Sequence, residues 1–67
     1  MIGIITYHEN GKWKNKLEGN KTATSTFDTK EEAIADGREE AKKFHTNHMI
    51  ENLEGKVTEQ HSYGENS

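Results

Sequence analysis

Histidines are the first side chains whose type and spacing suggest chemistry. His45 and His48 are three positions apart, and His61 follows in the next apolar stretch. Three imidazoles can hold a zinc ion. The spacing matches no strong zinc motif, and the helix dipole equally explains a histidine near the end of a helix. We therefore predict neither a metal nor a cofactor, and His45, His48 and His61 remain weak candidates for a metal site.

Lysines form the second pattern, with Lys12, Lys14 and Lys16 alternating along one stretch and Lys21 shortly after it. Alternate residues of a strand share a face, and a row of ammonium groups can follow phosphates. Base stacking needs an exposed aromatic ring beside the cations, whereas the same alternation turns Trp13 to the other face. Nucleic-acid binding by these four lysines is therefore an alternative function and not the favoured one.

The sequence contains side chains that could act in catalysis, but it singles out no arrangement of a nucleophile and a base. Residues 22–26 carry four hydroxyl side chains, and carboxylates are numerous throughout. General acid–base catalysis needs a pocket that shifts pKa values, and a core of this size rarely encloses one. We predict that the chain is not an enzyme and has no catalytic residue.

Size and composition limit which interactions can stabilise the fold. Its 67 residues allow one domain, expected to span residues 1–64 with a frayed tail at 65–67. There is no cysteine and no apolar run of about 20 residues, so we expect a soluble, cytoplasmic protein without disulfides. The formal net charge of −3 opposes general affinity for phosphate backbones. The core must come from a short set of side chains: Ile2, Ile4, Ile5, Trp13, Leu17, Phe27, Ile34, Phe44, Met49, Ile50, Leu53, Val57 and Tyr63.

A hairpin is predicted around the Asn-Gly pair at residues 10–11, because this dipeptide suits the two-residue turns of hairpins. A two-residue loop places His8 opposite Trp13 and Ile4 opposite Leu17, on one face of the sheet. The alternating lysines then take the other face.

A helix is predicted from residue 30 to about 45. Thr29 and Glu32 have the spacing of a capping box, which marks a helix start. Ala33, Gly37 and Ala41 recur every four residues and form a stripe of small side chains. Glycine costs about 1 kcal/mol relative to alanine inside a helix, so Gly37 is best explained by close approach to a sheet.

Residues 48–53 and 56–61 form a second expected hairpin across Glu54-Gly55, with a loop of two or three residues and an open register. Whether the threonine-rich residues 22–27 form a further strand is left open. The order is ββ(β)αββ. This predicts an α+β fold, in which a small antiparallel sheet of two hairpins, with four to five strands, has one helix packed on one face.

Short motifs follow one another in a fixed order along the chain: Tyr7-His8-x-x-Gly11-x-Trp13, Gly19, Phe27-x-Thr29-Lys30-x-Glu32-Ala33, Gly37-Arg38-x-x-Ala41, Ile50, Gly55-Lys56-Val57 and Ser62-Tyr63-Gly64. In this order and spacing the chain resembles the small bacterial and phage proteins grouped as domain of unknown function 2188. The resemblance spans nearly the whole chain. It implies a compact sheet-plus-helix domain and brings no activity, substrate or cofactor. The family tends to have basic residues after Trp13 and near the last strand, and this chain is more acidic at both places. This difference weakens the hypothesis of nucleic-acid binding.

By elimination, the predicted function is that of a small accessory or regulatory domain that binds another protein. Open edges of a small sheet can accept another strand, and a thin core gains from a symmetric dimer. An unknown protein partner and a homodimer are therefore the expected partners, and a histidine-based metal domain is the least favoured function. An acidic helix face is either ordinary solvated surface or a site for a basic partner: Glu32, Asp36, Glu39 and Glu40.

Overall fold

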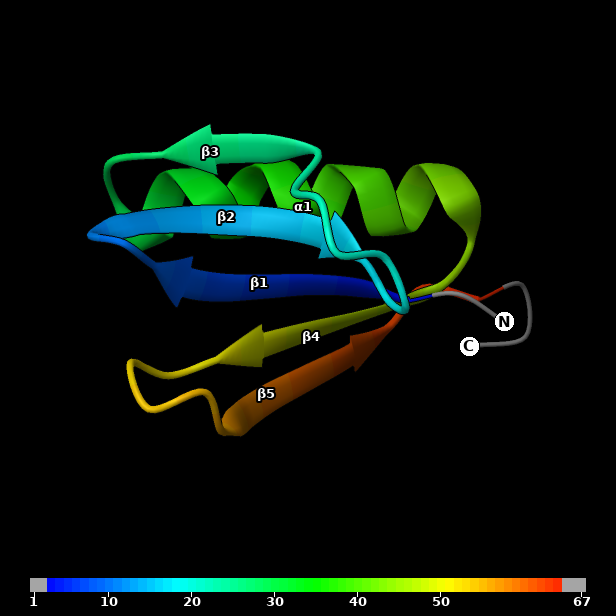
Figure 1. Cartoon of the computed structure of the whole chain (residues 1–67). Coiled ribbons are helices and arrows are strands. Elements are labelled where there is room, and N and C mark those ends of the chain that lie inside the picture. Colours follow the sequence, from blue (N-terminus) through cyan, green and yellow to red (C-terminus); the bar gives the residue numbers. More distant parts are fainter. Residues whose placement is uncertain (1–2, 65–67) are drawn as a thin grey trace.

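The computed structural model describes residues 3–64 and shows one helix on one face of a five-stranded sheet (Figure 1). The α+β class and the order ββ(β)αββ are confirmed, and the third strand is shorter than residues 22–27. The predicted tail at 65–67 and the predicted core residue Ile2 lie outside the described residues. The elements are β1 (Ile4–Glu9), β2 (Lys12–Leu17), β3 (Ser25–Phe27), α1 (Lys30–Phe44), β4 (Asn47–Glu51) and β5 (Val57–Ser62).

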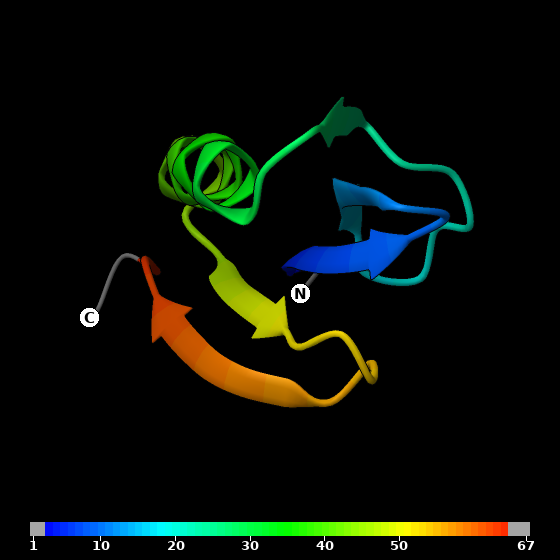
Figure 2. The same cartoon turned by 90° about the vertical axis from the view of Figure 1, so that its left-hand side faces the viewer.

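The strands lie in the order β3-β2-β1-β4-β5. Three neighbouring pairs are antiparallel, as predicted, whereas β1 and β4 are parallel, so the sheet is mixed and not wholly antiparallel. The reason is that α1 crosses over between the two hairpins and returns the chain beside β1 in the same direction. Figure 2, which looks along the helix, shows the sheet curving around α1 with β3 and β5 at its two ends. The central strand β1 thus has one neighbour from each hairpin.

The first hairpin turns as its sequence predicts. Asn10 and Gly11 have φ angles of 54° and 78°, which are the positive values that a two-residue hairpin turn of this type requires. The register is confirmed, with His8 opposite Trp13 and Ile4 opposite Leu17. The His8 and Trp13 rings meet edge to face with their centroids 5.0 Å apart.

Helix α1 begins and ends with clear caps. Thr29 is the N-cap, and its Oγ1 accepts a hydrogen bond from the Glu32 amide at 3.2 Å while its hydroxyl donates to the Glu32 carboxylate at 3.0 Å. At the other end His45 has a φ of 54° in the left-handed region and closes the last turn. The predicted stripe is confirmed, because the buried residues of the helix are Ala33, Gly37 and Ala41.

The second hairpin has a three-residue loop inside a backbone hydrogen bond from Asn52 N to Lys56 O at 2.8 Å. Gly55 takes the positive φ of 82° that such a loop needs in its last position. The structure fixes the register that the sequence left open, with His48 opposite His61. A register shift next to Ile50 inserts one extra residue into β5.

The core is smaller and more polar than the sequence predicts. Its buried apolar side chains are Ile4, Ala33, Ala41 and Ile50, and its buried polar side chains are Thr6, Asn15, Thr46 and His48. Three predicted core residues are instead exposed: Phe44 (53%), Leu53 (70%) and Val57 (45%). For Leu53 and Val57 the reason is the reach of the helix, since α1 contacts β1, β2, β3 and β4 but not β5. Side chains beside β5 therefore have no layer above them.

Candidate functional site

Three polar side chains lie side by side on the face of the sheet that α1 covers, called here the inner face. They are Thr6 of β1, Asn15 of β2 and His48 of β4, and none is more than 1% exposed. We call them the polar layer. Strand alternation places them on the same face as Ile4 and Ile50. A polar group in this position must find a hydrogen-bond partner inside the protein.

Gly37 of α1 lies directly over the polar layer. A Cβ atom at this position would lie 2.6 Å from His48 Nε2, 2.8 Å from Asn15 Oδ1 and 2.9 Å from Thr6 Oγ1. All three distances are shorter than real Cβ contacts. The helix therefore reaches the sheet at this point only because residue 37 has no side chain.

The hydrogen bonds of the polar layer run in one direction. The Asn15 amide nitrogen donates to the Ala33 carbonyl at 2.9 Å, which turns the Asn15 amide oxygen toward Thr6. That oxygen accepts from the Thr6 hydroxyl at 2.5 Å, and this uses the only proton of the hydroxyl. The 2.7 Å contact between Thr6 Oγ1 and His48 Nε2 therefore needs His48 as the donor. Neutral His48 accordingly carries its proton on Nε2.

The polar layer ends at a carboxylate of α1. Asp36 Oδ2 accepts from the Ser25 hydroxyl at 2.9 Å and from the Asn15 amide at 3.2 Å. Asp36 thus turns toward β3, although the sequence pattern placed it on the solvated helix face. Within residues 3–64 every buried side-chain nitrogen or oxygen has a hydrogen-bond partner. The polar layer is therefore internally satisfied.

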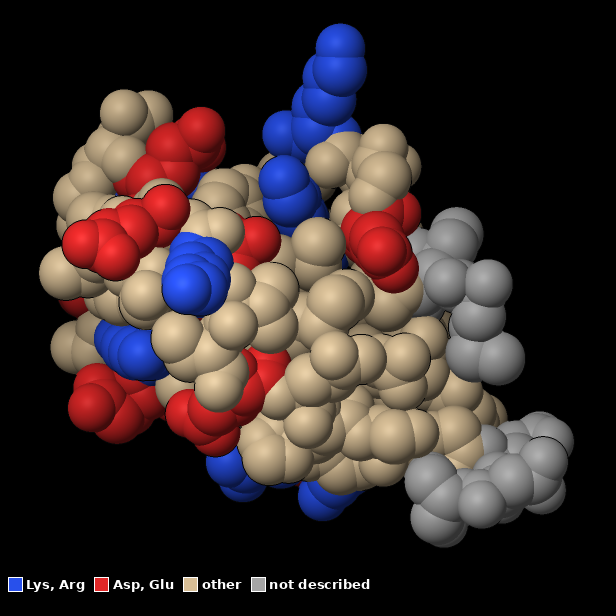
Figure 3. All heavy atoms as spheres, turned by 90° about the horizontal axis from the view of Figure 1, so that it is seen from below, with Lys and Arg blue, Asp and Glu red and all other residues tan. Residues whose placement is uncertain are grey.

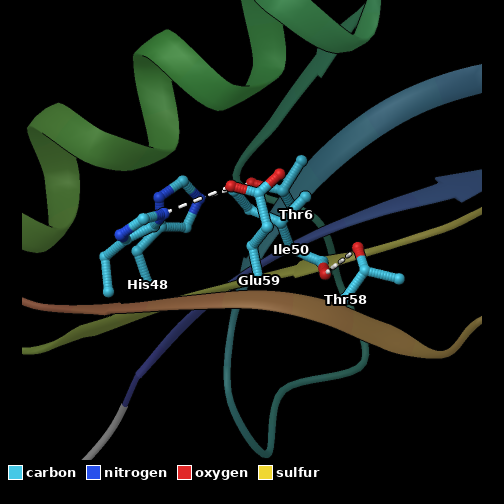
Figure 4. Close-up of polar contacts among 6 residues, drawn as sticks. Thr6, His48, Ile50, Thr58 and Glu59 are labelled. Atoms are coloured by element: carbon cyan, nitrogen blue, oxygen red, sulfur yellow. Dashed lines mark hydrogen bonds and ion pairs between the residues drawn. The ribbon is translucent and has the colours of Figure 1, made fainter.

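His48 is neutral in the folded protein near pH 7. Burial, followed by the nearby cationic groups of His61 and Arg38, lowers the pKa of His48 to about 4 against the opposing effect of Glu59. Figure 4 shows Glu59 of β5 projecting to the same side of the sheet as His48, with His48 hydrogen-bonded toward Thr6. A buried imidazole that loses its hydration resists protonation for this physical reason.

The three histidine candidates are only partly brought together. His48 and His61 face each other across β4 and β5, whereas His45 is the C-cap of α1. His61 is half-exposed, and its Nε2 lies 3.3 Å from Glu59 Oε1. Among the described residues, no group of three His, Asp or Glu side chains is arranged to hold a metal ion.

The lysine candidates of β2 lie on the sheet face opposite α1, called here the outer face. Lys12 forms an ion pair with Asp28, and the hydrogen bond from Lys12 lowers the pKa of the Asp28 carboxyl. Lys14 Nζ lies 3.1 Å from Glu9 Oε1. Two of the three ammonium groups therefore already have a carboxylate partner.

Aromatic rings are likewise engaged within the chain. Lys16 Nζ lies 4.6 Å from the centre of the Tyr7 ring on the outer face. Trp13 lies on the other face, as predicted, with Lys30 Nζ 5.3 Å from the centre of its ring. Lys21 is exposed in the segment between β2 and β3. The structure does not gather the four lysines around an exposed ring.

In the part of the chain that the structure describes, the longer of the two sheet edges is Val57–Ser62, called here the β5 edge. Every residue of β5 is exposed, its one neighbour is β4, and the helix does not contact it. The opposite edge strand, β3, has three residues. Lysine, proline and bulges usually protect long edges from pairing. β5 contains neither lysine nor proline, and its register shift lies near its first residues, so residues 59–62 are the regular part of the edge. Figure 3, which views the molecule from the β5 side, shows interspersed acidic and basic groups around a broad uncharged surface.

The sequence of the chain matches one known family over nearly all of this fold. Residues 4–63, from the start of β1 to just beyond β5, match the family described as uncharacterized protein conserved in bacteria, domain of unknown function 2188. The chain belongs to this family. No curated protein and no solved structure matches it. The resemblance drawn from the short motifs is therefore confirmed.

The motif residues that suggested the family mainly shape the backbone. Gly11 and Gly55 have positive φ angles in the two hairpin loops, Thr29 caps α1, and Gly37 lets the helix approach the sheet. These roles explain why the family motifs reveal a fold and no reaction.

Sequence reasoning missed the polar layer of this family member, although a signal for it was present. Thr6 and Asn15 are opposite each other in the predicted register of the first hairpin. The period of two puts both on the face of Ile4 and Leu17. Two polar residues opposite each other, among apolar residues of the same sheet face, are the pattern that could have predicted the polar layer.

Two open hollows mark the described surface. One is lined by Lys12, Thr26, Phe27, Asp28 and Glu32, and the other by Trp13, Lys30, Asn52, Leu53 and Glu54. Neither contains a residue of the polar layer. Over residues 3–64, no helix has the length and apolar character needed to cross a membrane.

Proposed function

We propose that this chain is a small, non-enzymatic protein-interaction module that binds an extended segment of a partner at the β5 edge. The observation that carries the proposal is that β5 is exposed at all six positions and, within residues 3–64, is paired on one side only. Strand addition to such an edge gains main-chain hydrogen bonds, and alternate side chains supply specificity. The cysteine-free composition fits a role in the bacterial cytoplasm.

The geometry of the polar layer supports a role without catalysis. Thr6 Oγ1 lies 2.7 Å from His48 Nε2, a distance typical of a nucleophile and its base. Both residues are buried beneath Gly37, and Nε2 already carries the proton that it donates to Thr6. His48 is therefore unable to take the hydroxyl proton through that nitrogen. The hydrogen bonds of the layer serve to fix the helix on the sheet.

The charge pairs of the outer face favour a protein partner over nucleic acid. Affinity for nucleic acid comes largely from ammonium groups that neutralise phosphates and release counterions. Lys12 and Lys14 are already paired with Asp28 and Glu9. A phosphate backbone would have to displace these carboxylates.

The backbone groups available for strand addition follow from the pairing of β5 with β4. The Tyr63 amide donates to the Thr46 carbonyl at 3.1 Å. Hydrogen-bonded and non-hydrogen-bonded pairs alternate along an antiparallel ladder, so His61 also bonds to β4 whereas Gln60 and Ser62 do not. The N–H and C=O groups of Gln60 and Ser62 therefore point away from β4, toward the outside of the sheet.

A proline substitution tests this role without cutting the β4–β5 ladder. In Gln60→Pro the outward N–H is lost, while Gln60→Thr keeps it and serves as the matched control. Proteins of a bacterial extract that bind the immobilised wild type should also bind Gln60→Thr. The amount that binds Gln60→Pro should be at least about tenfold lower, because one edge hydrogen bond is lost and the proline ring obstructs pairing. Equal binding to a folded Gln60→Pro would show that partners use another surface.

A further inference from the structure

The β5 edge has a self-complementary sequence. Two copies of one strand that pair antiparallel about a twofold axis perpendicular to the sheet bring residues of the same face opposite each other. The centre of such a pair exchanges two hydrogen bonds if its N–H and C=O groups point outward. Within the regular part of β5, Gln60 has outward groups and is followed by Ser62 with the same orientation. Gln60 is therefore the natural centre of a pair of β5 strands.

Charge selects the same centre. With Gln60 opposite itself, Glu59 of each copy faces His61 of the other, and both side chains lie on the inner-face side of the strand. An imidazole N–H can donate to a carboxylate, as His61 and Glu59 already show within one chain at 3.3 Å. Centring the pair on Glu59 would oppose two carboxylates, and like charges directly opposite each other are destabilising in a sheet. Centring it on His61 would leave Glu59 of each copy without an imidazole opposite it.

An exposed apolar side chain lies at the start of β5, where Val57 is 45% exposed. Antiparallel pairing brings the start of the strand in one copy toward its end in the other. The pairing therefore places Val57 of each copy at one end of the interface.

We infer that the strand bound at the β5 edge is β5 of a second copy of this chain, in the antiparallel register centred on Gln60. This inference rests on the proposed function and names its partner. Two five-stranded sheets then form one continuous sheet, with both helices on the same side. The pairing also gives a small domain without disulfides additional buried surface, which domains of this size commonly need.

Single cysteines test the register, because the natural chain contains none. Opposed residues of a hydrogen-bonded pair have Cα atoms about 5.5 Å apart, within the range that a disulfide spans. Gln60→Cys should therefore cross-link rapidly to itself under mild oxidation. Glu59→Cys and His61→Cys should cross-link slowly when each is alone, because diagonal neighbours are about 7–8 Å apart. A mixture of these two variants should cross-link as fast as Gln60→Cys.

A surface cysteine provides the background rate of this experiment. Glu31→Cys places the thiol on the exposed first turn of α1, away from β5, and should cross-link at least about tenfold more slowly than Gln60→Cys. Rapid self-linking of Glu59→Cys or His61→Cys, together with slow linking of Gln60→Cys, would overturn the register.

Sedimentation separates this inference from the proposed function. The wild type should approach twice its monomer mass of 7.6 kDa at high micromolar concentration, whereas Gln60→Pro should stay monomeric. If the wild type is monomeric but captures another protein that Gln60→Pro loses, the second copy is the wrong partner and the strand-binding role stands. If the wild type dimerises and Gln60→Pro dimerises equally, both the register and the β5 edge are wrong. If the wild type is monomeric and captures nothing, both proposals fail.

Discussion

A Cβ atom on Gly37 would lie 2.6 Å from Nε2 of His48, so the helix and the fourth strand meet at the one position of α1 where even a methyl group has no room. Two further polar atoms lie under 3.0 Å from the same point. The position of the helix on the sheet is thereby tied to the polar layer.

Gly37→Ala should destabilise the fold although alanine is the better helix former. We expect a loss of about 1–3 kcal/mol in the free energy of unfolding, because three buried polar atoms must move to admit the methyl group. Chemical denaturation measures it. Ala35→Gly, at an exposed helix position, is the matched control and should cost about 1 kcal/mol from propensity alone. A stabilised Gly37→Ala variant would contradict the close approach of the helix.

Thr6→Val should remove the middle of the hydrogen-bond chain while conserving shape. His48 Nε2 then loses its acceptor and Asn15 Oδ1 its donor, so we expect a loss of about 2–4 kcal/mol from two unsatisfied buried groups. Thr6→Ser keeps the hydroxyl and should retain most of that stability. Equal losses in the two variants would show that the methyl group matters more than the hydrogen bonds.

Acid should destabilise the protein through His48. Its pKa is about 4 in the folded state and about 6.5 in the unfolded state, so between these values the unfolded chain binds the proton and the folded chain does not. The associated stability is therefore complete above pH 6.5 and is lost as the pH falls toward 4. The wild type should lose about 3 kcal/mol more than His48→Gln between pH 7 and pH 4.

Denaturant unfolding at several pH values measures this difference, and an NMR titration reports the imidazole directly. His48→Gln keeps a side-chain N–H donor but does not titrate. Parallel pH profiles for the two proteins would mean that His48 titrates normally in the folded state.

Proline should distinguish neighbouring residues of β5. The His61 amide faces β4, so His61→Pro removes a ladder hydrogen bond and should cost about 2 kcal/mol or more. The Gln60 amide faces outward, so Gln60→Pro should cost less than about 1 kcal/mol in the monomer. Thermal unfolding at low protein concentration compares the two. The reverse order would invert the alternation on which the β5 edge depends.

Local chemistry explains what the sequence could predict. The turn at Asn10, the cap at Thr29 and the small side chain at Gly37 each depend on neighbours a few positions away, and all three have the expected roles. The register of the first hairpin follows from its two-residue loop in the same way. These features fix the order of the elements and the face that the helix covers.

The features that the sequence did not predict depend on contacts between segments that are far apart in the chain. Asn15 is inward by simple alternation, but its bonds to Ala33 and Asp36 require the position of the helix. Leu53 and Val57 have core-forming side chains, yet no pattern in the sequence reveals how far one helix extends across five strands. The register shift next to Ile50 likewise sets the β5 edge without a local signal.

The parallel pairing of β1 with β4 joins distant segments and so imposes a delay during folding. Ile4 and its partner His48 are 44 positions apart (48 − 4), whereas the first hairpin closes across a two-residue loop. A chain in which only that hairpin has formed presents one unpaired side of β1, rich in isoleucine and threonine, which other chains can join. Refolding at high protein concentration should therefore favour aggregation until Asn47–Glu51 has paired with β1.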